Sequence, residues 1–149
     1  MVYLLLIIAV VIGSLMPIQA SINAQLTRIL NNPFLGAFIS FCMGTLALFI
    51  MGLLQGNFFT DLKRLTLASP YHFLGGIFGA LFVGSSIVLI PKLGATTLMA
   101  SFVTGQLLMS LIVDHFGWFG VNVQPIGMQR TVGVILLFTG LLLIVKKAA

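Results

Sequence analysis

Apolar residues fill most of this chain in long blocks, and short polar stretches separate one block from the next. Five blocks reach the length of about 20 mostly apolar residues that a membrane-spanning helix needs. They cover about residues 3–26, 35–54, 71–90, 95–113 and 130–145. Apolar residues run through each block without alternating, which favours helices over the strands of a membrane barrel. The pattern predicts an all-α integral membrane protein, with residues 1–149 forming a single membrane domain.

The composition agrees with this prediction. The chain of 149 residues is 60% hydrophobic and only 6% charged, whereas about 25% of the residues in soluble domains are charged. Its formal net charge at pH 7 is +5, but the basic residues stand singly or in pairs at the ends of apolar blocks, as in membrane proteins. We therefore expect contact with membrane lipid and no nucleic-acid partner. Cys42 is the only cysteine, so the chain cannot form an internal disulfide bond.

The first block becomes polar in its second half. Gln19 and Asn23 are four residues apart, so they share one face of a helix. An unpaired amide in hydrocarbon costs several kcal/mol, and both side chains should therefore face protein or a water-filled cavity. Pro17 cannot donate a backbone hydrogen bond and frees the carbonyl of Gly13, which predicts a hinge. Interrupted helices of this kind line transporter sites, although hydrogen bonding between helices explains the amides equally well.

Few other polar side chains lie inside the blocks. Gln106 follows Gly105 in the fourth block, and we expect it to face Gln19 or Asn23 across a cavity, with pairing between helices as the alternative. Ser40 in the second block is a weaker candidate for the same cavity, since it also suits a packing groove. The first block carries no basic residue at its start, so we expect a retained helix rather than a signal peptide.

The third block carries glycines at four-residue spacing. Gly75 and Gly79 share one small face, and Gly76 and Gly84 lie on another. Small faces let two helix backbones approach closely. We expect them to pack within the chain, with a contact between subunits as the alternative.

Asp114 is the only acid near a membrane-embedded position, and His115 stands beside it. An acid inside a membrane is a candidate proton site, and histidine titrates near neutral pH. The aromatic residues that follow indicate a headgroup interface, so Asp114 would otherwise cap a helix or pair with Arg130. No cluster has metal-ligand spacing, and neither a catalytic triad nor a phosphate-binding loop is present. We therefore expect no metal, no cofactor and no enzyme activity.

Basic residues are divided almost evenly between the two sides that five spans define. Three lie on the side of the N-terminus and four on the other side, and the positive-inside rule sets orientation by this difference. The two groups are Lys63, Arg64 and Arg130, and Arg28, Lys92, Lys146 and Lys147. A difference of one predicts insertion in both orientations, unless another signal fixes one. Two opposite copies would pair about an axis in the membrane plane, as the halves of inverted-repeat transporters do.

Several motifs together resemble a known family. They are Pro17-x-Gln19-x-x-x-Asn23 with Arg28, Pro33, Ser40-Phe41, Gly44, Pro91-x-Leu93-Gly94-Ala95, Gly105-Gln106 and Asp114-His115-Phe116-Gly117-Trp118. In this order they resemble the YdcZ-type inner-membrane exporters of the drug/metabolite transporter superfamily. The resemblance implies a bacterial inner-membrane protein whose single-copy members form antiparallel, dual-topology homodimers. Small multidrug-resistance exporters carry a coupling glutamate in their first helix, and this chain has no acid there.

The sequence thus favours a small transporter that exports a metabolite or drug-like solute by alternating access. Its partner would be a second, inverted copy of itself or a paired homologue. Two alternatives remain open: a passive dual-topology channel for an ion or a solute, and a subunit of a membrane complex that transports nothing itself.

Overall fold

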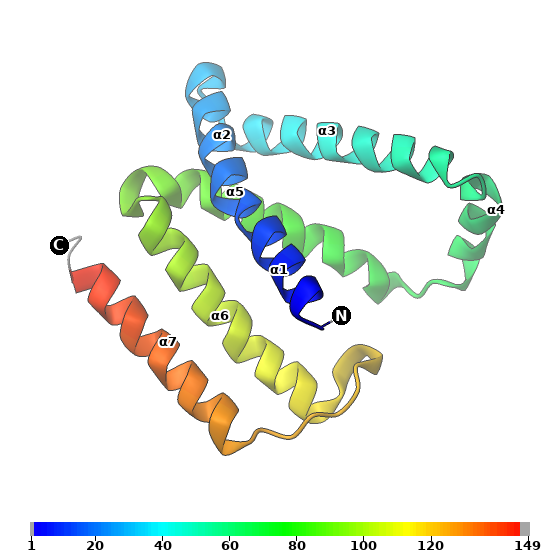
Figure 1. Ribbon diagram of the computed structural model, residues 1–149. Coiled ribbons are helices and arrows are strands. Elements are labelled where there is room, and N and C mark those ends of the chain that lie inside the picture. Colours follow the sequence, from blue (N-terminus) through cyan, green and yellow to red (C-terminus); the bar gives the residue numbers. More distant parts are fainter. Residues whose placement is uncertain (1, 147–149) are drawn as a thin grey trace. The chain divides into compact units, whose positions relative to one another are not determined.

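The computed structural model describes residues 2–146, and helices make up most of them (Figure 1). The chain divides into two compact units, Met1–Pro91 and Lys92–Ala149, and each unit is described by itself. Lys147, which the charge count includes, lies outside the described residues. The first unit holds α1 (Val2–Gly13), α2 (Leu15–Leu30), α3 (Pro33–Leu54), α4 (Phe58–Leu62), the 3-10 helices η1 (Lys63–Leu67) and η2 (Pro70–Phe73), and most of α5 (Leu74–Leu93). The second unit holds α6 (Ala95–Phe116), the 3-10 helix η3 (Trp118–Gly120) and α7 (Met128–Lys146).

Five helical stretches are long and apolar enough to cross a membrane. They are Val2–Leu30, Pro33–Leu54, Pro70–Leu93, Ala95–Phe116 and Met128–Val145. No strand occurs among residues 2–146. The predicted all-α membrane fold with five spanning helices is confirmed, whereas the joining of both units into a single membrane domain stays a prediction.

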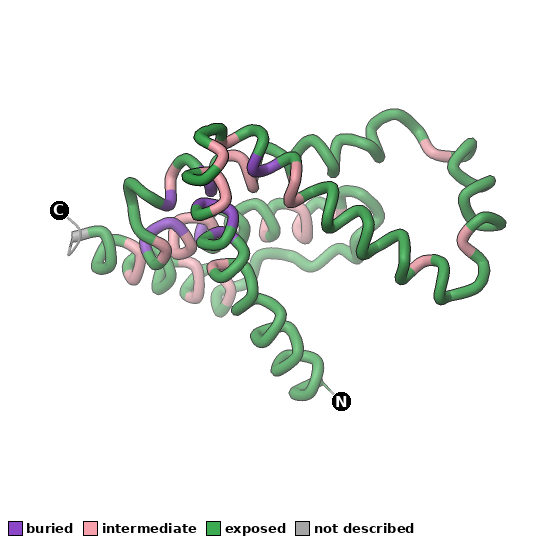
Figure 2. Tube along the Cα trace, turned by 90° about the horizontal axis from the view of Figure 1, so that it is seen from above, coloured by how far each residue is buried: buried purple, intermediate pink, exposed green. Residues whose placement is uncertain are grey.

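Little of the apolar surface is buried within the chain. Figure 2 shows short buried stretches between long exposed ones. The buried apolar side chains of the described residues are Ala20, Ala24, Ala37, Ile87, Ile90 and Leu98. Large apolar side chains are exposed along every spanning helix, which a soluble protein avoids and a lipid bilayer covers. The packing agrees with a chain whose solvent is the bilayer.

The first span is interrupted at Ser14, between α1 and α2. The Ser14 hydroxyl donates a hydrogen bond of 2.7 Å to the carbonyl of Val11, and its backbone N–H donates to the carbonyl of Val10 at 2.9 Å. Pro17 stands one turn later and has no N–H for the carbonyl of Gly13. The interruption lies where the sequence predicts a hinge, and its bending during function stays a prediction.

A tight corner joins α2 to α3. Asn31 ends α2 in the left-handed conformation, with φ of 51°, which asparagine tolerates better than most residues. The Asn32 side chain then accepts hydrogen bonds from the backbone N–H groups of Phe34 and Leu35, at 3.0 and 3.1 Å. Pro33 is the first residue of α3, where a backbone N–H would have no carbonyl partner within the helix, so a proline costs no hydrogen bond there. Asn31-Asn32-Pro33 between two apolar blocks predicts a tight turn, and the structure confirms it.

Gly36 of α3 packs directly against α2. A methyl group there would collide with Oγ1 of Thr27 and lie 3.5 Å from its Cα. Gly36→Val is therefore expected to lower the free energy of unfolding by about 1–3 kcal/mol, because the two helices must separate. Gly44→Val on the same helix is the matched control, since a methyl group there meets no atom within 4 Å. Thermal unfolding of both purified variants in detergent checks this, and equal stability would contradict the close α2–α3 contact.

Two spanning helices end later than the sequence predicts. α5 continues through Pro91, because a proline removes only its own N–H donor, and Gly94 with φ of 76° follows its end. α6 continues through Asp114 and ends at Gly117, with φ of 64°. Left-handed backbone favours glycine, so the glycines mark these ends. The predicted ends at residues 90 and 113 are each about one helical turn too early.

Three of the four predicted packing glycines of α5 have no close neighbour within the first unit. A methyl group at Gly75, Gly76 or Gly84 would meet no neighbouring atom within 4 Å. At Gly79 it would meet only the ring of Phe41, at 3.6 Å. Nothing in the first unit thus packs closely against the first three glycines, and their packing within the chain stays a prediction. Packing against a second copy remains the alternative.

Candidate functional site

Two polar atoms of α2 are buried without a hydrogen-bond partner. Asn23 is 4% exposed, and among the described residues neither its Nδ2 nor Oγ1 of Thr27 has a partner within reach. The two residues are four apart and share one face of the helix. Leaving such a group unsatisfied costs about 1–3 kcal/mol. Both atoms therefore lack the hydrogen bond that a buried polar group normally makes.

Most other hydroxyls in the spanning helices are satisfied by their own helix. They donate to the carbonyl three or four residues earlier, at 2.7 to 3.2 Å. The donors are Ser14, Ser21, Ser86, Ser101, Thr104, Ser110, Thr131 and Thr139. Asn23 and Thr27 differ from these residues. The Thr27 hydroxyl does not donate to a carbonyl of its own helix, and the Asn23 amide nitrogen has no such bond either.

The other predicted cavity residues are less buried. Gln19 is exposed on α2, one turn before Asn23, and Ser40 is half-buried on α3. Gln106 is exposed on α6, in the second unit. α2 thus places Gln19 and Asn23 on adjoining parts of one face, while the predicted facing of Gln106 toward them stays a prediction.

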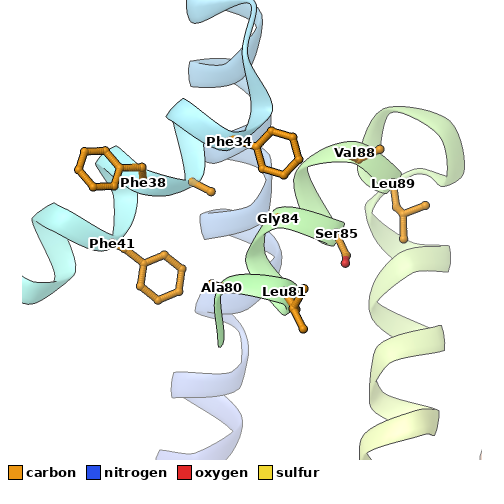
Figure 3. Close-up of a pocket in the computed structure, with 10 residues that line it drawn as sticks. Phe34, Phe38, Phe41, Ala80, Leu81, Gly84, Ser85, Val88 and Leu89 are labelled. Carbon is orange, nitrogen blue, oxygen red and sulfur yellow. The ribbon is translucent and has the colours of Figure 1, made fainter. Parts of the chain in front are cut away.

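An apolar cavity of about 600 Å³ lies between α3 and α5 (Figure 3). Figure 3 shows the rings of Phe34 and Phe41 pointing from α3 toward α5. The lining residues are Phe34, Ala37, Phe38, Phe41, Ala80, Leu81, Gly84, Ser85, Val88 and Leu89. Its volume is in the range of small-molecule sites, but Ser85 supplies the only side-chain polar group. None of the predicted cavity residues lines it.

A smaller cavity of about 260 Å³ lies between α2 and α5. It is lined by Ser21, Ala24, Gln25, Arg28, Ile90 and Pro91. Ser21, Gln25 and Arg28 are spaced by four and three residues, so they form one face of α2. That face lies opposite the one that carries Asn23, given 100° of rotation per residue. Polar groups therefore occur on two separate faces of this one helix.

Asp114 forms an ion pair in the second unit. Its Oδ2 lies 3.4 Å from a terminal nitrogen of Arg130, and the two side chains are 31% and 38% exposed. Arg130 also donates to the side-chain oxygen of Gln124, whose backbone N–H donates to the carbonyl of Asp114 at 2.8 Å. The Nδ1 of His115 accepts a bond of 3.3 Å from the N–H of Ile126. Both predicted coupling residues thus help to tie the loop before α7 to the end of α6.

The sequence-based reading of the site missed two features. Phe34, Phe38 and Phe41 occur at spacings of four and three, which predicts a common face, but such a face is ordinary in a spanning helix. Ser21, Gln25 and Arg28 follow a similar spacing, which predicts a shared face but does not indicate what lies opposite it. Periodicity in the sequence shows which residues share one face of a helix. Which other helix packs opposite that face and closes a cavity is known only from the structure.

One comparison with known proteins identifies a family. The family model described as "Putative inner membrane exporter, YdcZ" matches residues 4–143. The matched stretch reaches into all five spanning helices. No curated protein and no solved structure matches the chain.

Proposed function

The chain belongs to the YdcZ family of inner membrane exporters, and we propose that it exports a small metabolite or drug-like solute by alternating access. Membership makes it a multi-pass protein of the inner membrane. The family is one of membrane transporters rather than enzymes.

The observation that carries the proposal is the buried, unsatisfied pair on α2. Nδ2 of Asn23 and Oγ1 of Thr27 would bond polar groups of the solute, with Gln19 one turn away. Ser40 of α3 and Gln106 of α6 are the other residues proposed to bond the solute. The interruption at Ser14 lies about two and a half turns before Asn23 and about three and a half before Thr27, so bending there would change the side of the membrane to which the pair is open.

An antiparallel homodimer supplies the second half of the transporter. The near-balanced basic residues favour insertion in both orientations. Gly75 and Gly76 of α5 have no close neighbour within the first unit, and small residues suit contact between helices of two subunits. A homologous partner inserted the other way round would serve equally. Both observations support an antiparallel pair, and both fit a second copy of this chain as well as a homologous partner.

A passive channel is the second candidate, and the state of the acids favours it. The chain contains two acidic residues. Asp61 lies 3.8 Å from Arg64, and Asp114 pairs with Arg130. A coupled exporter needs a group that takes up and releases a proton, so Asp114 or His115 would have to leave its present partner during the cycle.

Flux measurements in proteoliposomes distinguish the exporter from the channel. With a solute identified by a metabolite screen, we expect accumulation against its gradient when a proton gradient is imposed. Dissipation of the solute gradient alone would support the channel. Asp114→Asn tests the coupling role: accumulation should be lost while downhill flux persists. Unchanged accumulation would remove Asp114 from the mechanism.

A further inference from the structure

The cavity between α2 and α5 contains a cationic side chain that the chain does not neutralise. Arg28 lines it, and no hydrogen bond or ion pair joins Arg28 to any residue between 2 and 146. The two acids of the chain are engaged elsewhere, Asp61 with Arg64 and Asp114 with Arg130. The guanidinium therefore offers all five of its N–H donors to the cavity and its surroundings.

The other polar groups of the cavity decide what it can bind. The amide of Gln25 has no partner among the described residues and supplies two more N–H donors. The Ser21 hydroxyl already donates to the carbonyl of Pro17 at 2.8 Å, so it offers only lone pairs. Pro91 has no N–H, and Ile90 is apolar. Donors from Arg28 and Gln25 thus meet in a cavity without a carboxylate, which suits an acceptor with a negative charge.

We propose that this cavity binds an oxyanion, a carboxylate or a phosphate, held by Arg28 and Gln25. The planar guanidinium matches the two oxygens of such a group in a bidentate arrangement. The cavity lies near the C-terminal ends of α2 and α5, whose dipoles disfavour an anion. That effect is screened at exposed helix ends, and two charge-assisted hydrogen bonds outweigh it.

The cavity lies on the face of α2 opposite to Asn23, which separates this site from the proposed solute pair. Its volume of about 260 Å³ is below the range of about 300–1,000 Å³ that drug-sized ligands occupy. Its floor includes Ala24 and Ile90, which are 7% and 8% exposed. Such a cavity holds a headgroup or a small anion. Two sources fit this chemistry, the phosphate of an anionic phospholipid and a small soluble anion.

Binding to the purified full-length protein tests the proposal. One arm titrates inorganic phosphate into protein in nanodiscs of neutral phosphatidylcholine and follows binding by calorimetry. The other arm adds phosphatidylglycerol to the nanodiscs and counts retained lipid by native mass spectrometry. Arg28-dependent binding in the first arm assigns a soluble anion, and dependence in the second arm alone assigns a lipid headgroup.

The variants distinguish binding in this cavity from an effect of the net positive charge of the protein. Arg28→Gln should weaken binding at least about 10-fold, since both charge-assisted bonds are lost. Arg28→Lys keeps the charge but not the planar fork, and should fall between this variant and the unmodified protein. Lys63→Gln is the matched control, because it removes one positive charge outside the cavity. Circular dichroism and size exclusion confirm that each variant is folded.

Two results would overturn the proposal. One is binding of phosphate and phosphatidylglycerol by Arg28→Gln as tightly as by the unmodified protein. The other is an equal loss of affinity in Lys63→Gln, which would show that binding depends on net charge and not on this cavity. Neither measurement involves transport, so a failure here leaves the exporter proposal intact, and a failed flux assay leaves this site intact.

Discussion

Asn23→Leu is expected to abolish export and, at the same time, to raise the stability of the protein. Leucine has the same number and branching of side-chain heavy atoms as asparagine and needs no hydrogen bond. Removing the buried, unsatisfied Nδ2 should add about 1–3 kcal/mol to the free energy of unfolding. The solute loses its partner, so the export rate should fall at least about 10-fold. Opposite changes in stability and activity are typical of a residue kept for function.

Thermal unfolding in detergent and export from proteoliposomes measure the two effects on the same preparations. Thr139→Val is the matched control, because its exposed hydroxyl donates only to the carbonyl of Ile135, at 2.8 Å. We expect this control to leave export within about twofold, since it removes one local bond. A less stable but fully active Asn23→Leu protein would show that the amide is structural, as hydrogen bonding between helices would require.

Fixing the orientation of the chain is expected to abolish export as well. Lysines at Asn57, Thr60 and Thr66, which are exposed, raise the basic count on the N-terminal side from three to six against four. Lys63→Gln with Arg64→Gln lowers the same count to one against four. By the positive-inside rule each protein should insert in a single orientation, opposite to that of the other.

Neither fixed protein can form an antiparallel pair by itself, so each should be inactive alone. Expressing both in one cell should restore export, because opposite copies meet again. The exposed Asp61–Arg64 pair that the second protein loses contributes little to stability. Full activity of either protein alone would show that one orientation is enough.

Elements set by local chemistry could be predicted from the sequence. The five spans follow from length and apolarity, the corner at Asn31 to Pro33 from turn chemistry, and the pairing of Asp114 with Arg130 from complementary charge. The ends of α5 and α6 were missed because proline and aspartate look like breaks. In both helices the end lies at a glycine with positive φ.

The site could be predicted only in part. Spacing places Gln19 and Asn23 on one face, but whether an amide is satisfied depends on neighbours from other helices. The glycines of α5 show the same limit: a small face indicates that a close contact is possible, but only the structure shows that Gly79 meets the ring of Phe41. The anion cavity also could not be predicted from the sequence, because it forms only where Ile90 and Pro91 of α5 lie near Arg28 of α2.

The most direct test of the antiparallel exporter is the orientation of the chain in the membrane. A single cysteine is introduced at Thr66, in the polar connection before α5, in a Cys42→Ala background. An impermeant maleimide is then applied to intact cells and to inverted vesicles. We expect comparable labelling from both sides, because the basic residues differ by only one between them. Labelling from one side alone would contradict dual topology and the antiparallel homodimer.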